Sequence, residues 1–131
     1  DDFNIIENEN DLFKINFDFV NFGSCIQYFN NYEEILKKIS KNSKYIFFSA
    51  THLYDSSEKI LEKHIVVKQV NVLPKVNYLY FFNRDRFLKI FQNEKFKLIF
   101  ENENLTDKIN YNNFKKYLRN IQYSDFLLKK E

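Results

Sequence analysis

The sequence is poor in the residues that build several common functional sites. Its 131 residues include one glycine, one proline and one cysteine, and neither methionine nor tryptophan. With Gly23 alone, the chain cannot form a G-x-G-x-x-G loop, a phosphate-binding P-loop or the G-x-S-x-G elbow of many hydrolases. A single cysteine, Cys25, likewise excludes an internal disulfide framework and a zinc site built from several cysteines.

Further absences bear on location and partners. No apolar run reaches the roughly 18 residues of a membrane-spanning helix, and no signal peptide is visible. The net charge is only +2, and the lysines alternate with acidic residues instead of forming a basic face. We therefore expect a cytoplasmic protein with no membrane span and no nucleic-acid partner. Because the chain opens on Asp1-Asp2 and lacks methionine, we also expect it to be a segment of a longer protein.

What is abundant is apolar and aromatic. Hydrophobic residues make up 44% of the chain and aromatic residues 19%, enough for the packed core of one domain. Asn, Lys, Ile, Phe and Tyr are frequent, a bias typical of AT-rich genomes. We therefore expect most of the 16 Phe and 9 Tyr to fill the core and not to stack on nucleic-acid bases.

The first half of the chain reads as a βαβ unit. The apolar runs 17–22 and 44–50 predict two buried strands, and unbroken runs of this kind favour a parallel sheet covered on both faces. Between them, apolar residues at helical spacing predict a helix over about 31–41. Asn31 is its expected N-cap, with Glu34 placed for a capping box. Strand, helix and strand in this order indicate an α/β fold.

The second half is more varied. Residues 102–121 are polar and weakly periodic. The remaining patterns predict, in chain order, a short helix over 55–61, a strand at 64–70, a connection at Pro74, a helix over 83–92, a half-exposed strand at 95–101, a short helix at 113–119 and a final strand at 123–129.

Catalytic motifs are nearly absent. His52 and His64 are too far apart to form a helical metal-binding pair, and no cluster of other ligands accompanies them, so we predict no metal site. Cys25 has no basic neighbour in sequence, which favours a small buried residue over a nucleophile. The sequence does not identify a catalytic residue.

Two strand ends carry polar side chains. They are residues 23–28 after the first strand and residues 49–52 after the second. In an open α/β sheet, ligands bind beyond the carboxyl ends of parallel strands. These groups either line a ligand site or only cap the next helix, and both interpretations stand at this point.

The first of these segments resembles a known family. Residues 18–28 read Asp-Phe-Val-x-Phe-Gly-Ser-x-Ile-Gln-Tyr, and Tyr-x-x-Ile-Leu follows at 32–36. The pattern is similar to the fourth strand and following helix of class I S-adenosylmethionine-dependent methyltransferases. It is most similar to a family with a Ser-x-Leu-Gln-Tyr element that is linked to surface-polysaccharide genes. The resemblance extends over about 17–131.

The resemblance implies a fold. The family has a Rossmann-like sheet of order 3-2-1-4-5-7-6 whose last strand is antiparallel. Residues 1–131 would be a single partial domain, the C-terminal half with strands 4-5-7-6 and flanking helices. Residues 1–16 would be an N-terminal remnant, with strand 3 near Phe3–Ile6. The glycine-rich loop that binds S-adenosylmethionine would lie upstream, so the cofactor is expected in the full-length protein. This segment alone would bind the cofactor weakly or not at all and would be inactive.

The resemblance also implies site residues. Ser24, Gln27 and Tyr28 match the family element that lines the methionine end of the cofactor and the acceptor, and Thr51 matches a threonine after strand 5. Gln69 and Tyr78 match weaker positions. Ala50 stands where the family tends to have arginine, and His52 and Leu79 stand where it tends to have proline. These departures indicate a different substrate or an inactive copy.

Three functions follow as hypotheses. The first is methyl transfer from S-adenosylmethionine to a small-molecule or glycan acceptor. The second is a non-catalytic interaction or scaffold domain that keeps the α/β fold, and the third is half of another Rossmann-type enzyme, such as a nucleotide-sugar enzyme. Because strand 17–22 would be an apolar sheet edge, we also expect the segment to be marginally stable, to self-associate through that edge, or to cover the edge with residues 1–12.

Overall fold

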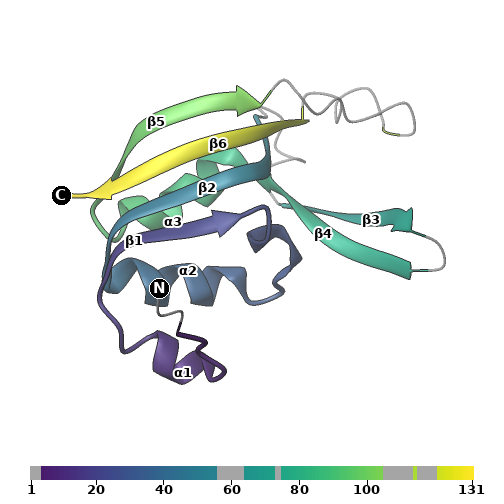
Figure 1. Cartoon of the computed structure of the whole chain (residues 1–131). Helices are drawn as coiled ribbons and strands as arrows, with labels where there is room; N and C mark the ends of the chain where they lie inside the picture. Colours follow the sequence, from purple (N-terminus) through teal and green to yellow (C-terminus); the bar gives the residue numbers. More distant parts are fainter. Residues whose placement is uncertain (1–3, 56–63, 73–74, 105–113, 115–120) are drawn as a thin grey trace.

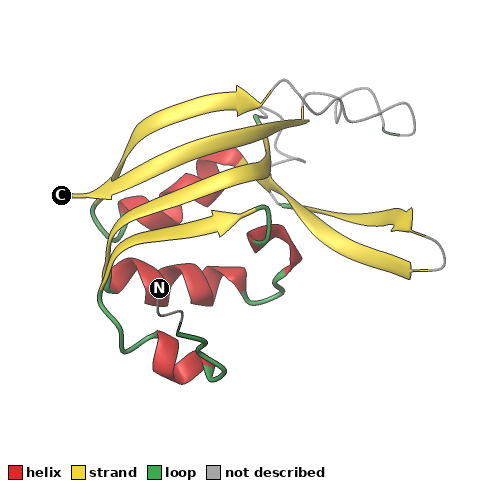
Figure 2. Cartoon of the chain, viewed as in Figure 1, coloured by secondary structure: helices red, strands yellow, loops and turns green. Residues whose placement is uncertain are grey.

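The chain forms one open mixed sheet with helices. The computed structural model describes residues 4–55, 64–72, 75–104, 114 and 121–131. The elements in chain order are α1 (Glu9–Leu12), β1 (Phe17–Gly23), the 3-10 turn η1 (Ile26–Tyr28), α2 (Tyr32–Lys41), β2 (Ser43–Tyr54), β3 (Ile65–Val72), β4 (Lys75–Asn83), α3 (Arg84–Gln92), β5 (Phe96–Asn104) and β6 (Ile121–Lys130). Figures 1 and 2 show their arrangement.

The main part of the sheet has the order β1-β2-β6-β5. β1 runs parallel to β2, with Val20 opposite Ile46. β6 runs antiparallel to both of its neighbours, so that Leu128 lies opposite Ile46 of β2 and Leu98 of β5. The predicted order 4-5-7-6, with the last strand antiparallel between 44–50 and 95–101, is confirmed.

A hairpin extends the sheet beyond the end of β1 (Figure 1). β4 runs parallel to the last residues of β2, with Leu53 opposite Phe82, and pairs along its length with β3 in antiparallel fashion. β6 pairs with one edge of β2 at Leu53. β4 therefore pairs with the other edge of β2, beyond Ser49, where the pairing with β1 ends. The strand predicted at 64–70 is confirmed as β3. The sequence patterns predict no element for residues 75–82, which form β4, and Pro74 lies outside the described residues.

The helices α2 and α3 bury their apolar stripes against one face of the sheet. Ile35, Leu36 and Ile39 of α2 join a core that also contains residues of α3, β2 and β6. At its centre, the ring of Phe48 lies 4.7 Å from that of Phe126 and 5.4 Å from that of Phe87. The helices predicted at 31–41 and 83–92 are confirmed.

The helix starts differ in how they are capped. The Asn83 side chain accepts a hydrogen bond of 3.0 Å from the backbone N–H of Arg86, a typical N-cap for α3. Asn31 precedes α2 but makes no such bond, so the predicted capping box is not formed. None of the described helices is long and apolar enough to cross a membrane.

The opposite face of the sheet carries a second set of apolar side chains. Strand alternation turns Phe19, Tyr45, Phe47 and Leu127 away from the helices. The rings of Phe19 and Phe47 stack at 6.4 Å, and Phe19 is 55% exposed. The expectation of a buried strand at 17–22 is therefore wrong for this side of β1. Its position at an edge of the sheet is as predicted.

The segment before β1 contains no strand within its described residues, 4–16. Residues 4–8 have no regular structure, and the helical turn α1 follows. The Asn8 side chain accepts from the N–H of Asn10 and so favours this turn. Leu12 and Phe13 pack against the core, which holds the segment beside α2. The strand expected near Phe3–Ile6 is absent from residues 4–6. Phe3 lies outside the described residues, as do the predicted helices at 55–61, apart from Asp55, and at 113–119, apart from Phe114.

Candidate functional site

The loop after β1 folds around a buried amide. Gln27 is fully buried, and its Nε2 donates to the hydroxyl of Ser24 over 3.2 Å. Its Oε1 is also buried and has no hydrogen-bond partner. The neighbouring Ile26 enters the core and fixes the turn in place. An unpaired buried acceptor is costly, so Gln27 offers an oxygen suited to a donor that the described chain does not supply.

Two strained residues lie side by side at this point. Gly23 and Ser49 are opposite each other in β1 and β2. The next residue on each strand, Ser24 and Ala50, has a positive φ, 49° and 47°. The N–H of Ser24 donates to the Ser49 carbonyl over 3.0 Å. Such backbone costs about 1–3 kcal/mol per non-glycine residue and is often found at functional sites.

Beyond Ala50, β2 resumes its pairing with β6. The register shifts between Phe48 and Thr51, and Thr51 then lies opposite Ser124. Thr51 and His52 therefore belong to the strand, which corrects the expectation that β2 ends at residue 50. The irregularity between Phe48 and Thr51 accommodates the change of register, so β2 continues to Tyr54 although the apolar run in the sequence ends near Ala50.

Thr51 and His52 are buried polar residues. The Thr51 hydroxyl and the His52 Nδ1 lack hydrogen-bond partners. The His52 ring lies 4.8 Å from that of Phe81 and 4.3 Å from that of Tyr123. Burial lowers the pKa of His52 to about 4, so the imidazole is neutral at physiological pH.

The weaker candidates divide between two faces of the hairpin. The Tyr28 hydroxyl donates to Oε1 of Gln69 over 3.1 Å and links the loop after β1 to β3. Tyr78 pairs with Lys68, the neighbour of Gln69, and so lies on the other face of the hairpin. The structure thus brings together Ser24 with Gln27 and Tyr28 with Gln69, while Tyr78 is 64% exposed and apart from them.

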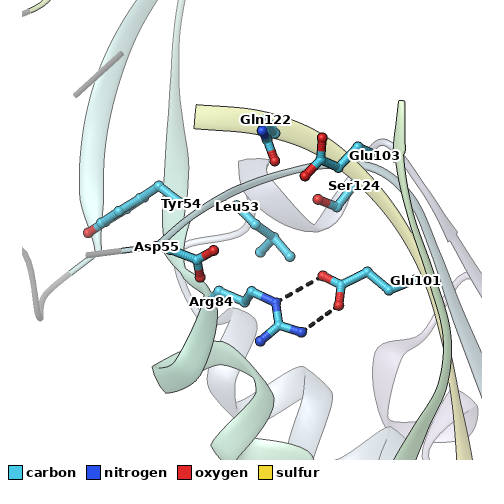
Figure 3. A pocket seen from close by; sticks show the side chains of 8 residues that line it. All are labelled: Leu53, Tyr54, Asp55, Arg84, Glu101, Glu103, Gln122 and Ser124. Atoms are coloured by element: carbon cyan, nitrogen blue, oxygen red, sulfur yellow. Dashed lines mark hydrogen bonds and ion pairs between the residues drawn. The ribbon is translucent and has the colours of Figure 1, made fainter. Parts of the chain in front are cut away.

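A separate cavity of about 370 Å³ lies at the end of β2. Figure 3 shows the side chains that line it, which are Leu53, Tyr54, Asp55, Arg84, Glu101, Glu103, Gln122 and Ser124. The Arg84 guanidinium binds the Glu101 carboxylate through two hydrogen bonds, one of them 2.9 Å between Nε and Oε1. None of the predicted site residues lines this cavity.

Sequence reasoning missed the cavity because its polar residues come from four separate segments. The alternation of Glu101 and Glu103 on β5 was the signal available. Within the described ranges, no three His, Cys, Asp or Glu side chains lie close enough together to hold a metal ion.

Comparison with known proteins gives a fold but no family. No family model and no curated protein matches the sequence. Among solved structures, the N-terminal domain of EvdMO1 with SAH bound matches 95% of this chain and 50% of its own, with a TM-score of 0.53 and 15% identity. A Listeria monocytogenes protein described as an S-adenosylmethionine-dependent methyltransferase matches 87% of this chain and 61% of its own, with a TM-score of 0.56 and 14% identity.

A third match has the same character. An S-adenosylmethionine-dependent methyltransferase from Clostridium acetobutylicum covers 98% of this chain and 61% of its own, with a TM-score of 0.52 and 9% identity. The chain thus spans about half to three fifths of the length of the structures it matches. Over most of its length, it has the fold of a portion of S-adenosylmethionine-dependent methyltransferase structures.

Proposed function

We propose that this chain is the acceptor-side half of an S-adenosylmethionine-dependent methyltransferase acting on a small-molecule or glycan acceptor. The observation that carries the proposal is the unpaired Gln27 Oε1 beside the strained backbone of Ser24 and Ala50. This point is at the carboxyl end of β1, where ligands of open α/β sheets bind. The fold likeness agrees, and one matched structure was determined in the presence of SAH and D-fucose.

The residues present fit one end of the cofactor. Ser24 and Gln27 offer a hydroxyl and an amide to its polar groups, whereas the one glycine of the chain cannot form a glycine-rich loop. When bound, the cofactor would supply an activated methyl group. Transfer of that group depends on alignment and exclusion of water more than on acid–base help. A buried neutral His52 and a loop held by Tyr28 and Gln69 suit that requirement.

The test is calorimetric titration of SAH into two proteins, this chain and a longer product of the same gene that includes the upstream region. We expect a Kd above about 1 mM for the chain alone, at the weak end of specific binding, and micromolar binding by the longer protein. Gln27→Leu in the longer protein should weaken binding, and Glu94→Gln, just beyond the C-terminal end of α3, should not. Absence of binding by the longer protein would refute the proposal.

One observation favours the scaffold alternative. The N–H of Ala50 donates to the Asp125 carboxylate, so this N–H is tied to β6 and is not available to a ligand. A protein that keeps the fold only to bind a partner is expected to satisfy such backbone groups within its own chain. The same titration decides between the two functions, because a scaffold binds no SAH in either form.

A further inference from the structure

The cavity of Figure 3 has the dimensions of a small ligand site. Its volume of about 370 Å³ is at the lower end of the range for ligand pockets in proteins. It lies between the end of β2, the start of α3 and the facing strands β5 and β6. It shares no residue with the Ser24–Gln27 loop.

The charges in the cavity are unbalanced. Three carboxylates, Asp55, Glu101 and Glu103, face one guanidinium. Arg84 turns toward Glu101 and donates to its carboxylate through Nε and Nη2, as Figure 3 shows. Asp55 and Glu103 form no ion pair with any residue that the structure describes. With Glu101 paired to Arg84, which also attracts Asp55, the cavity keeps a net negative charge for a ligand.

The wall of the cavity also holds an unused hydroxyl. Ser124 is 4% exposed, and its side chain points into the cavity between Leu53 and Glu103 in Figure 3. It makes no hydrogen bond to another side chain or backbone group in the described part of the chain. A hydroxyl buried to this degree is normally paired, and here the open side is the cavity itself.

We propose that this cavity binds a small hydroxylated amine of about monosaccharide size. Its ammonium group would donate hydrogen bonds to the carboxylates of Asp55 and Glu103, and its hydroxyls would pair with Ser124 and Gln122. Charge-assisted hydrogen bonds of this kind are about twice as strong as neutral ones. The proposal rests on the cavity alone and does not depend on methyl transfer.

The test compares two probes that differ in one group, D-glucosamine and D-glucose. Each is titrated into ¹⁵N-labelled chain at low ionic strength, where charge attraction is least screened, and amide shifts are followed. We expect saturable shifts at Tyr54, Arg84 and Ser124 with glucosamine, and binding at least about tenfold weaker with glucose, the ratio expected from one charged hydrogen bond.

Matched variants locate the effect. Glu103→Gln keeps the shape of the side chain and should weaken glucosamine binding about fivefold or more, with little change for glucose. Glu94→Gln removes an equal charge outside the cavity and should change neither. Ser124→Ala should weaken the binding of both sugars. The amide spectrum of each variant shows whether the variant is folded. Equal binding of the two sugars, no saturable shifts at the cavity, or an unchanged affinity in Glu103→Gln would each overturn the proposal.

Discussion

The backbone N–H of Ala50 donates a 2.7 Å hydrogen bond to the side-chain carboxylate of Asp125. The bond lies where the register of β2 and β6 shifts, so it replaces a backbone pair that the irregularity removes. Asp125→Ala should lower the free energy of unfolding by about 1.5–3 kcal/mol, the range for a hydrogen bond to a charged group. Urea denaturation at neutral pH measures this value.

Asp125→Asn is the control for that experiment, because the amide oxygen can still accept from Ala50. It should cost less than the alanine variant. Equal losses in the two variants would show that the bond contributes little and that packing of residue 125 accounts for the effect.

Removing the unpaired hydroxyl of Thr51 should raise the free energy of unfolding, whereas the Asp125 change lowers it. Thr51 is fully buried, and its Oγ1 has no hydrogen-bond partner within the described chain. Thr51→Val replaces the hydroxyl with a methyl group of similar size, and we expect it to stabilise the chain by about 1 kcal/mol. Ser40→Ala is the matched control, since the buried Ser40 hydroxyl does donate to the Leu36 carbonyl over 2.6 Å. A stabilised control, or a destabilised Thr51→Val, would contradict this account.

Stability should fall in mild acid because of the buried His52 and the half-buried His64. Burial lowers the pKa of His52 and of His64 from 6.5 to about 4. The unfolded chain therefore binds these protons first, so stability is complete above about pH 7 and is lost as the pH falls from about 6.5 to about 4. For His52, the loss is on the order of 2–3 kcal/mol. Urea denaturation at a series of pH values gives the slope.

His52→Phe tests which histidine is responsible. It keeps a ring stacked beside Phe81 and Tyr123 and removes the titrating group. The variant should lose stability less steeply between about pH 6.5 and pH 4, with the remaining slope due to His64, whose Nδ1 accepts from the N–H of Asn83. An unchanged slope would remove His52 from the explanation.

The β1 edge should mediate self-association. Phe19 is 55% exposed, and the one charged residue of β1, Asp18, is paired with Lys44. Sedimentation velocity over a range of concentrations should show a dimer that Phe19→Lys disrupts, since charge protects an edge strand. Ile99→Lys, at a residue 51% exposed on the opposite edge strand β5, should have no effect. A chain that is monomeric at every concentration would contradict the prediction.

The parts of the fold that the sequence predicted are those that a local pattern determines. The apolar spacing of Ile35, Leu36 and Ile39 identifies α2, and the continuous runs of β1 and β2 identify two parallel strands, of which only β2 is buried. β4 was missed because its residues read as a connection after Pro74. Its alternation of Val76, Tyr78, Tyr80 and Phe82 was the signal, and pairing with β3 and β2 determines the outcome.

The site was predictable only in part. The Ser-x-x-Gln-Tyr pattern indicated the loop where Gln27 bonds Ser24. The positive φ of Ser24 and Ala50 was not predictable, because neither residue is a glycine. The cavity was equally hidden, since Asp55, Arg84 and Ser124 meet only through the tertiary fold.

The position of β6 between β2 and β5 has a consequence for how the chain acquires its structure. β6 follows every other described strand in sequence, yet it alone joins β5 to the rest of the sheet. During synthesis on the ribosome, β1, α2 and β2 can associate early, whereas β5 must wait for its partner to emerge. Pairing across so long a stretch of sequence is slow. The nascent chain therefore exposes the edges of β2 and β5 that β6 will cover until β6 is made, which makes that interval the one in which a chaperone is most useful.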